Sequence, residues 1–159
     1  MNRTGQLEIS LSTSDAGQTR ELGRRLAGLL VGGEVIELCG PLGAGKTQFA
    51  KGLARGLGVS ADEPVVSPTF VLMRQYQGRL LLCHVDAYRL GGLDELADLG
   101  LEELLAGGDA VVAIEWADRF ARFLDARYFC VELEHGGDRR RRVRITFPDS
   151  RSRAAFEGR

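Results

Sequence analysis

Hydrophobic and polar positions at the start of the chain predict a strand, a helix and a second strand. Apolar residues alternate with polar ones over residues 7–11, which is typical of a half-buried strand. Leucines at helical spacing over residues 22–30 predict a helix, and the oxygen-bearing side chains of residues 12–15 can cap its first turn. Gly32-Gly33 is expected to end that helix, so the apolar run over residues 34–39 predicts the next strand.

The middle of the chain predicts one further helix, an irregular connection and a hairpin. Residues 47–55 follow a glycine-rich loop and have a helical pattern, whereas the two prolines within residues 64–70 favour an extended or irregular segment. Apolar-rich runs at residues 71–76 and 79–86 flank Gln77-Gly78, which is typical of a hairpin turn. Part of the sheet is therefore expected to be antiparallel.

The pattern then changes to helices around one fully apolar strand. Residues 93–105 have a helical pattern that is interrupted near Gly100, and residues 117–124 are a short helix candidate. Between them, residues 110–115 form a continuous apolar run closed by an acid. Such a run is expected of a central strand that is covered on both faces.

The last two apolar runs, residues 128–133 and 143–147, alternate around Gly136-Gly137 and predict a second hairpin. Helices that connect strands favour parallel pairing, whereas hairpins require antiparallel pairing. The sum is one three-layer α/β domain over residues 1–159, with a mixed, mostly parallel central sheet and antiparallel hairpins.

Composition agrees with this picture and excludes several classes. A chain of 159 residues can bury an ordinary core, and 44% hydrophobic residues with a net charge of −1 exclude a disordered tail and an obligate nucleic-acid-binding polycation. The chain has neither an apolar signal core nor a run of about 18 apolar residues, so a cytoplasmic protein without membrane spans is expected. Cys39, Cys83 and Cys130 stand far apart and are expected to be buried, reduced thiols.

The stretch Gly40-Pro41-Leu42-Gly43-Ala44-Gly45-Lys46-Thr47 has the G-x-x-x-x-G-K-T spacing of a P-loop. Its glycines let backbone N–H groups approach phosphate oxygens, and the N-terminus of the following helix favours an anion. Lys46 would reach the β- and γ-phosphates of a nucleotide, and the Thr47 hydroxyl would ligate Mg²⁺. The strand before the loop and the helix after it favour a P-loop NTPase-like fold. The residues of this loop expected to bind the nucleotide are Gly40, Leu42, Gly43, Ala44, Gly45, Lys46 and Thr47.

Hydrolysis by a P-loop needs further groups that fix the metal and place water. Asp86 and Glu115 each end a strand pattern, and ligands of open α/β sheets gather at the carboxyl ends of strands. A helix cap or a surface acid is the alternative for each. Thr69 follows the P-loop at the distance of a switch segment, with an ordinary turn threonine as its alternative. Asp86, Glu115 and Thr69 are therefore the catalytic candidates.

The base-reading motifs of GTPases are absent from the sequence. Lys46 and Lys51 are the only lysines, so neither N-K-x-D nor T-K-x-D can occur, and no D-x-x-G follows the loop. An adenine nucleotide is favoured over a guanine nucleotide.

Four motifs, taken in order, resemble those of the TsaE (YjeE) family of bacterial ATPases. They are the P-loop at residues 40–47, Ser67-Pro68-Thr69-Phe70, His84-Val85-Asp86-Ala87-Tyr88-Arg89-Leu90 and Ile114-Glu115-Trp116. The resemblance covers nearly the whole chain. It implies a Mg²⁺-dependent ATPase that works with the TsaD and TsaB proteins to form threonylcarbamoyladenosine beside the tRNA anticodon. The transfer itself would belong to TsaD, and tRNA contact would be indirect, through the complex.

The resemblance also implies residue roles. It makes Lys46 the phosphate binder and makes Thr47 and Glu115 the Mg²⁺ ligands. It gives Asp86 a place in the outer metal shell or the water site, and it makes Thr69 a switch residue.

Three further features are less specific. Trp116, the only tryptophan, is implied by the resemblance to lie near the nucleotide, and core packing is its alternative. The basic run at residues 139–144 could contact tRNA phosphates or the nucleotide, or be a solvated hairpin edge. Alternation puts Arg142 and Arg144 on the face of the strand opposite its apolar residues. His84 is expected to be a structural strand histidine without a catalytic role.

Two other functions stay open. A small-molecule kinase is the main alternative, because many such kinases are P-loop domains of similar length. It would need an arginine-lined lid and an acceptor site, whereas the only arginine cluster lies in the final hairpin. The second alternative is a nucleotide-dependent binding module with negligible turnover of its own.

Overall fold

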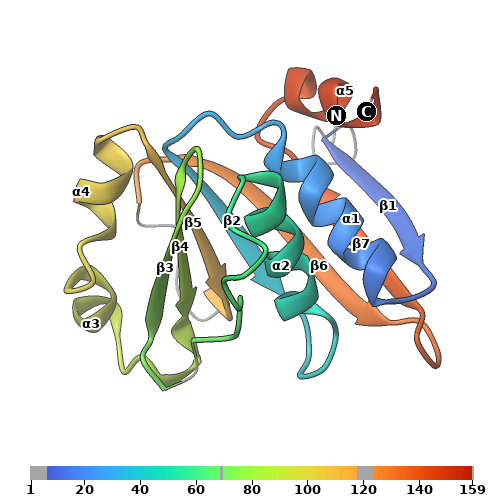
Figure 1. Ribbon diagram of the computed structural model, residues 1–159, viewed down its shortest axis with the longest axis horizontal. Coiled ribbons are helices and arrows are strands. Elements are labelled where there is room, and N and C mark those ends of the chain that lie inside the picture. Colours follow the sequence, from blue (N-terminus) through green and yellow to red (C-terminus); the bar gives the residue numbers. More distant parts are fainter. Residues whose placement is uncertain (1–6, 69, 118–123, 159) are drawn as a thin grey trace, which may run out of the picture.

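The computed structural model describes residues 7–68, 70–117 and 124–158, which form a seven-stranded sheet in the order β1-β7-β6-β2-β5-β4-β3 (Figure 1). The strands are β1 (Glu8–Thr13), β2 (Glu34–Cys39), β3 (Met73–Gln77), β4 (Leu81–Asp86), β5 (Ala110–Glu115), β6 (Arg127–His135) and β7 (Arg141–Thr146). The four central strands pair in parallel, and the β3–β4 and β6–β7 hairpins pair antiparallel, as does β1 with β7. The predicted mixed, mostly parallel sheet is confirmed.

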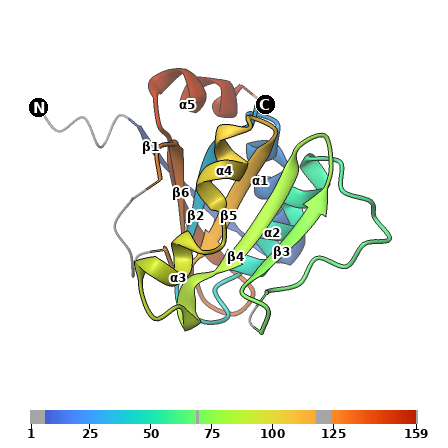
Figure 2. The ribbon, with the colours of Figure 1, turned by 90° about the vertical axis from the view of Figure 1, so that its left-hand side faces the viewer.

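Helices cover both faces of this sheet (Figure 2). The helices are α1 (Ala16–Ala27), α2 (Lys46–Gly56), α3 (Leu93–Ala97), α4 (Leu101–Ala106) and α5 (Ser150–Glu157). Apolar residues of α1, α2 and α5 share one buried cluster with the sheet, and those of α3 and α4 share a second cluster with it. The three-layer prediction is therefore confirmed.

Strand β5 shows why the sheet needs two covering layers. Val111 and Ala113 belong to the cluster under α1 and α2, whereas Val112 and Ile114 belong to the cluster under α3 and α4. All six residues of β5 are buried, as the sequence predicts for a central strand. The strand therefore delivers its last residue, Glu115, to the carboxyl edge of the sheet from a rigid position.

Two element boundaries differ from the sequence prediction. Helix α1 ends at Ala27, with Gly28 as its C-cap, rather than at the glycine pair that follows; Leu30 still packs in the core. Strand β3 begins at Met73 because Leu72 has a φ of 64°, a left-handed conformation that a strand cannot contain. The helix candidate at residues 117–124 lies mostly outside the described residues.

Helix α5 was not predicted from the sequence. Its N-cap is Asp149, whose Oδ1 accepts a hydrogen bond from the N–H of Ser152 at 2.7 Å. This hydrogen bond, together with an ion pair to Arg127, holds the pKa of the Asp149 carboxyl below its ordinary value. Phe156 is fully buried and packs against Phe147 at 5.4 Å between ring centroids. A single aromatic anchor gives no periodic stripe, which explains why the pattern missed this helix.

The cysteines are only partly as expected. All three are free thiols, and Cys83 is buried, which raises its pKa to about 11. Cys39 and Cys130 are half-buried instead of buried. They lie on the neighbouring strands β2 and β6. A hydrogen bond between their thiols is the largest cause of a raised pKa of Cys130, and burial is the next.

Across the described residues, every helix is too short or too polar to cross a membrane.

Helices α1 and α2 touch backbone to backbone, and glycine makes this contact possible. A Cβ placed on Gly52 would lie 1.9 Å from the carbonyl oxygen of Arg20. We expect Gly52→Ala to lower the free energy of unfolding by about 1–3 kcal/mol through overpacking, despite the better helix propensity of alanine. Urea unfolding measures the change. Gly92→Ala is the control, since a Cβ there meets no atom within 4 Å; equal stability of both variants would contradict the prediction.

Candidate functional site

The predicted P-loop connects β2 to the N-terminus of α2, as the sequence indicates. Gly43 and Gly45 have φ angles of 77° and 106°, and Gly45 is the N-cap of α2. These left-handed conformations require glycine and turn the loop around the start of the helix. Leu42, at the tip of the loop, is 86% exposed. The loop therefore presents backbone N–H groups beside a helix N-terminus, an arrangement suited to an anion.

Lys46 lies at the first turn of α2 and is 6% exposed. Its Nζ donates hydrogen bonds to the carbonyl oxygens of Gly40 at 2.6 Å and Pro41 at 3.1 Å. The same ammonium group stands 4.0 Å from the ring centroid of Trp116. These contacts hold the ammonium group at the inner wall of the loop, on the side where the predicted catalytic acids Asp86 and Glu115 lie.

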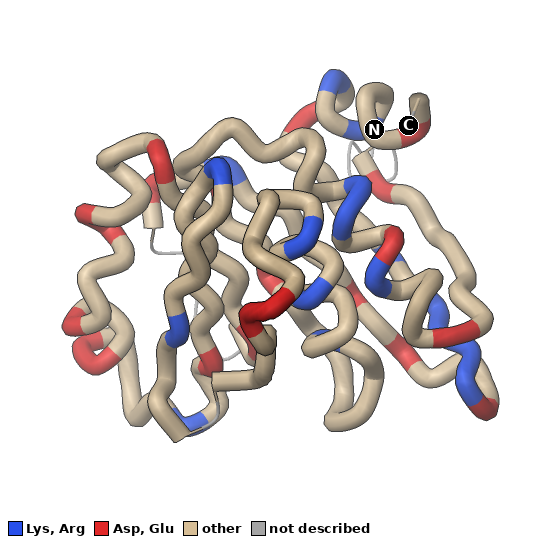
Figure 3. Tube along the Cα trace, in the orientation of Figure 1, with Lys and Arg blue, Asp and Glu red and all other residues tan. Residues whose placement is uncertain are grey.

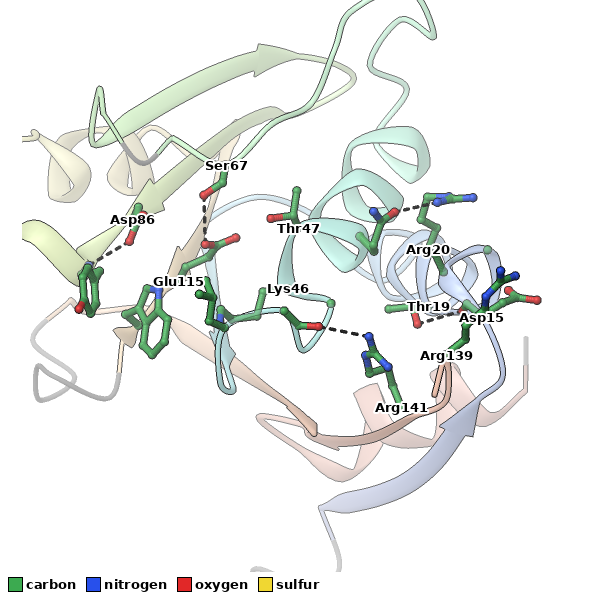
Figure 4. A pocket seen from close by; sticks show the side chains of 18 of the residues that line it. Asp15, Thr19, Arg20, Lys46, Thr47, Ser67, Asp86, Glu115, Arg139 and Arg141 are labelled. Carbon is green, nitrogen blue, oxygen red and sulfur yellow. Dashed lines mark hydrogen bonds between the residues drawn. The ribbon is translucent and has the colours of Figure 1, made fainter. Parts of the chain in front are cut away.

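Asp86 and Glu115 lie side by side because β4 and β5 end at the same level. The two residues are register partners in this parallel pair, and each is 4% exposed. Both point to the face of the sheet that α2 covers, because they alternate with residues of the opposite cluster such as Val85 and Ile114. Both acids thus lie at the carboxyl ends of their strands, where the sequence placed them (Figure 4).

The two acids differ in their partners. Oδ1 of Asp86 accepts a hydrogen bond from the N–H of Tyr88 at 3.0 Å and so caps the short 3₁₀ turn η2 (Ala87–Arg89). Asp86 thus has the cap role that the sequence left as an alternative, and it also lines the cleft. Glu115 instead meets two side chains, Ser67 at 3.4 Å and His84 at 3.1 Å, one at each carboxylate oxygen.

These groups share one cleft with a volume of about 1140 Å³. At one end it is lined by Lys46, Thr47, Asp86 and Glu115, and at the other by residues from the start of α1 and from the β6–β7 hairpin. Figure 4 shows the side chains of both ends turned toward the same space. The cleft is large enough for a nucleotide, with its length running from the strand-end acids to the hairpin.

The donor atoms near Lys46 suit Mg²⁺. Thr47 offers a hydroxyl oxygen and Glu115 and Asp86 offer carboxylates, all of them oxygen ligands of the kind that Mg²⁺ prefers. No group of three or more His, Cys, Asp or Glu side chains that could hold a metal was found among the described residues.

Trp116 follows Glu115 with a strained backbone. Its φ is 62°, which is an outlier for a bulky residue and is consistent with a functional site. The ring is half-buried and contacts Tyr88 at 5.2 Å between centroids. Since it also faces Lys46 and lines the cleft, the structure places this residue at the site rather than in the core.

Several cleft residues were not singled out from the sequence. Ser67 contacts Glu115, although only its neighbour Thr69 was named as a candidate, and Thr69 lies outside the described residues. Arg20 also lines the far end of the cleft and was not named. Arg139 and Arg141 line it too, and they belong to the basic run that the sequence offered as a nucleotide or tRNA contact; Arg141 donates to the carbonyl oxygen of Gly43 at 3.2 Å. The P-loop spacing cannot reveal them, because they come from elements that only the fold brings together.

The basic run at residues 139–144 spans the turn before β7 and the first residues of that strand. Arg139 and Arg141 line the cleft. Arg142 and Arg144 lie on the opposite face of the strand from its buried residues, as predicted, where Arg144 pairs with Glu8 at 3.2 Å. The run therefore serves both as a cleft wall and as a solvated sheet face.

Charges are unevenly distributed over the molecule (Figure 3). Lys and Arg gather along α1, α2 and the β6–β7 hairpin, whereas α3 and α4 carry acidic residues. The positive side coincides with the end of the cleft that Arg20, Arg139 and Arg141 line. Asp15 and Asp138 line the same end, so only the excess of arginine there favours an anionic ligand.

Comparisons with known proteins agree with the motifs. A sequence model of the family described as "Threonylcarbamoyl adenosine biosynthesis protein TsaE" matches residues 13–143. The tRNA threonylcarbamoyladenosine biosynthesis protein TsaE of Treponema pallidum is 41% identical over 86% of this chain and 97% of the relative. The Streptomyces coelicolor protein of the same name is 52% identical over 62% of this chain and 67% of the relative.

A solved structure shares the fold. The crystal structure of YdiB from Bacillus subtilis matches with a TM-score of 0.74 at 30% sequence identity, covering 95% of this chain and 93% of that chain. The P-loop NTPase-like fold expected from the sequence is thereby confirmed. Because the family match extends from β1 into β7 and a relative aligns over nearly its full length, this chain belongs to the TsaE family of threonylcarbamoyl adenosine biosynthesis proteins.

Proposed function

We propose that the protein binds ATP with Mg²⁺ in the cleft and hydrolyses it slowly, and that this cycle supports threonylcarbamoyl transfer to tRNA. The observation that carries the proposal is the convergence of Lys46, Thr47, Asp86 and Glu115 on one cleft from α2, β4 and β5. A phosphate cradle alone binds, whereas a cradle facing two buried acids can also direct water and metal.

The triphosphate would lie along the P-loop. Backbone N–H groups from Gly43 to Thr47 and the N-terminus of α2 would surround the phosphate oxygens. Lys46 would exchange its bonds to loop carbonyls for bonds to phosphate, which its three ammonium hydrogens and flexible stem permit.

The nucleoside would extend toward the far end of the cleft. Asp15 and Thr19 of the α1 region and Arg139 and Arg141 of the hairpin line this end. Guanidinium planes stack well on a base and also bind phosphate, so these arginines suit either part of the nucleotide. This length of cleft beyond the P-loop favours a nucleotide over inorganic phosphate or pyrophosphate.

Three side chains of the protein would act on the metal or on its water. Bound Mg²⁺ would neutralise charge that develops on the transferring phosphoryl group. The Thr47 hydroxyl and the Glu115 carboxylate would hold it, and Asp86 would order its water shell or the attacking water. Trp116 would close the side of the site next to Lys46, where it limits access of bulk water.

TsaD and TsaB are the proposed partners, with tRNA contacted indirectly through their complex. The family's place in threonylcarbamoyl adenosine biosynthesis supports this assignment. The acidic surface of α3 and α4 would repel tRNA phosphates, which favours an indirect contact from that side. All of these steps would take place in the cytoplasm.

Phosphate release from ATP, measured with the chain alone and beside TsaD and TsaB, tests the proposal. We expect slow Mg²⁺-dependent release alone and a dependence of repeated tRNA modification on this chain and on ATP. Transfer of phosphate to a small acceptor without partners would support the kinase alternative instead. Undiminished multiple-turnover modification without this chain would refute the proposed role.

A further inference from the structure

His84 is a fully buried histidine directly beneath the acids of the cleft. It lies on β4, two residues before Asp86, and its side chain is 0% exposed. Its Nε2 lies 3.1 Å from Oε1 of Glu115. A buried polar side chain is costly unless its hydrogen bonds are satisfied, so this contact accounts for the position of the ring.

The sheet register explains how His84 reaches Glu115. His84 pairs with Ala113 on the neighbouring strand, and Asp86 pairs with Glu115 two residues later. All four side chains point to the face that α2 covers, because residues of the opposite cluster alternate with them. The short side chain of Ala113 leaves room for the imidazole to extend diagonally to Glu115, while Asp86 stays beside the carboxylate.

The chemistry of the pair fixes which atom donates. A carboxylate that ligates Mg²⁺ only accepts hydrogen bonds, so in the proposed role of Glu115 the hydrogen between the two groups belongs to Nε2 of His84. Nδ1 of the same ring is buried, and no hydrogen-bond partner for it exists among the described residues. A neutral ring with hydrogen on Nε2 leaves only a bare acceptor there, which costs less than a buried, unpaired N–H.

Glu115 is therefore held at both oxygens. His84 contacts Oε1, and the Ser67 hydroxyl lies 3.4 Å from Oε2. Glu115 lines the same cleft as Thr47 and Lys46. Fixing a ligating side chain in this way removes rotamers that would have to be lost when a ligand binds.

We propose that His84 is a positioning residue that orients the Glu115 carboxylate for Mg²⁺-nucleotide binding through its Nε2–H. This inference rests on the proposed function. It gives the buried histidine a role in the site, whereas the sequence assigned it only to the structure of the strand. Loss of such an orienting partner typically weakens metal affinity or activity by about 10-fold to 100-fold.

A matched pair of variants separates orientation from packing. The amide nitrogen of glutamine is as many bonds from Cα as Nε2 of histidine, so His84→Gln can still donate to Glu115. His84→Asn is one bond too short. We expect His84→Asn to raise the Mg²⁺ concentration for half-maximal response about 10-fold to 100-fold, and His84→Gln to restore it close to wild type.

The fluorescence of Trp116, the only tryptophan, reports this response. The fluorescence is recorded while Mg²⁺ is added to the full chain in the presence of ATP. Three further measurements are made on each variant: ATP affinity in EDTA, phosphate release and thermal unfolding. ATP affinity in EDTA should stay unchanged in both variants. Cys83→Ala is the packing control, since Cys83 is buried on the same strand but belongs to the opposite cluster.

The outcomes are distinguishable. Equal Mg²⁺ responses for wild type, His84→Asn and His84→Gln, with Glu115→Gln impaired, would overturn the inference and leave the proposed function intact. An unimpaired Glu115→Gln would refute the proposed function itself. Equal impairment of both His84 variants would show a purely structural role.

A measurement on the wild-type chain tests the inference even if the His84 variants fail to fold. Imidazole ¹⁵N shifts distinguish the two neutral tautomers, and the chain has only two histidines, so a His135→Gln spectrum assigns the signals. Hydrogen on Nε2 of His84 is expected. Hydrogen on Nδ1 instead would overturn the inference.

Discussion

Replacing Lys46 with alanine is expected to abolish tight ATP binding. Lys46 is 6% exposed, so its ammonium group would meet phosphate with little water between them. Removing one partner of a buried, hydrogen-bonded charge pair costs about 2–5 kcal/mol, which corresponds to a rise in Kd of roughly 30-fold or more. Titration of a fluorescent ATP analogue measures the Kd.

Lys51→Ala is the matched control for this variant. Lys51 is the only other lysine; it lies on the same helix and is not among the residues that line the cleft. The Lys46 side chain also bonds two loop carbonyls, so thermal unfolding must show that Lys46→Ala keeps its fold. Similar ATP affinity for both variants, with both folded, would contradict the assignment of Lys46.

The fold followed from local pattern wherever the pattern was long or strongly periodic. Residues 34–39 and 110–115 became strands over the predicted bounds, because central strands covered on both faces carry mostly apolar residues, which leaves a recognisable run in the sequence. Helix α5 was missed because one capping aspartate and one buried phenylalanine, Phe156, form it. Its stability comes from tertiary packing, which no local window contains.

Some residues of the candidate site could also be predicted from local sequence, and others could not. Lys46 and Thr47 could be predicted because the residues of a P-loop that bind phosphate are contiguous in sequence, so one short stretch identifies them. Asp86 and Glu115 could be predicted from their place at strand ends, although only the register of β4 and β5 sets them side by side. Their individual roles stay predictions.

The other cleft residues depend on contacts between distant segments. Arg141 meets Gly43 across 98 positions of sequence, and Ser67 meets Glu115 across 48. Nothing in the local sequence of either pair specifies its partner. His84 shows the same limit, since a lone histidine in an apolar strand does not reveal the carboxylate that its ring nitrogen meets on the next strand.

Replacing Glu115 with glutamine is expected to stop hydrolysis while sparing much of the ATP binding. The amide keeps the volume of the side chain and can still accept the hydrogen bond from His84. The negative charge is lost, which weakens the hold on Mg²⁺ and removes the group that could accept a proton from water. We expect the rate of phosphate release to fall by about 10²–10⁴-fold, the range for loss of a positioned acid–base group.

Two further variants make this result specific. Glu37→Gln neutralises a half-buried acid on β2 that does not line the cleft, and it should hydrolyse ATP like wild type. Asp86→Asn keeps an oxygen that can cap Tyr88, so any loss of rate in it reports the carboxylate charge rather than the turn. Single-turnover phosphate release at saturating ATP measures all three variants. Equal rates for wild type and Glu115→Gln would show that hydrolysis depends on another group, because the two proteins differ in this site only by the charge of one buried carboxylate.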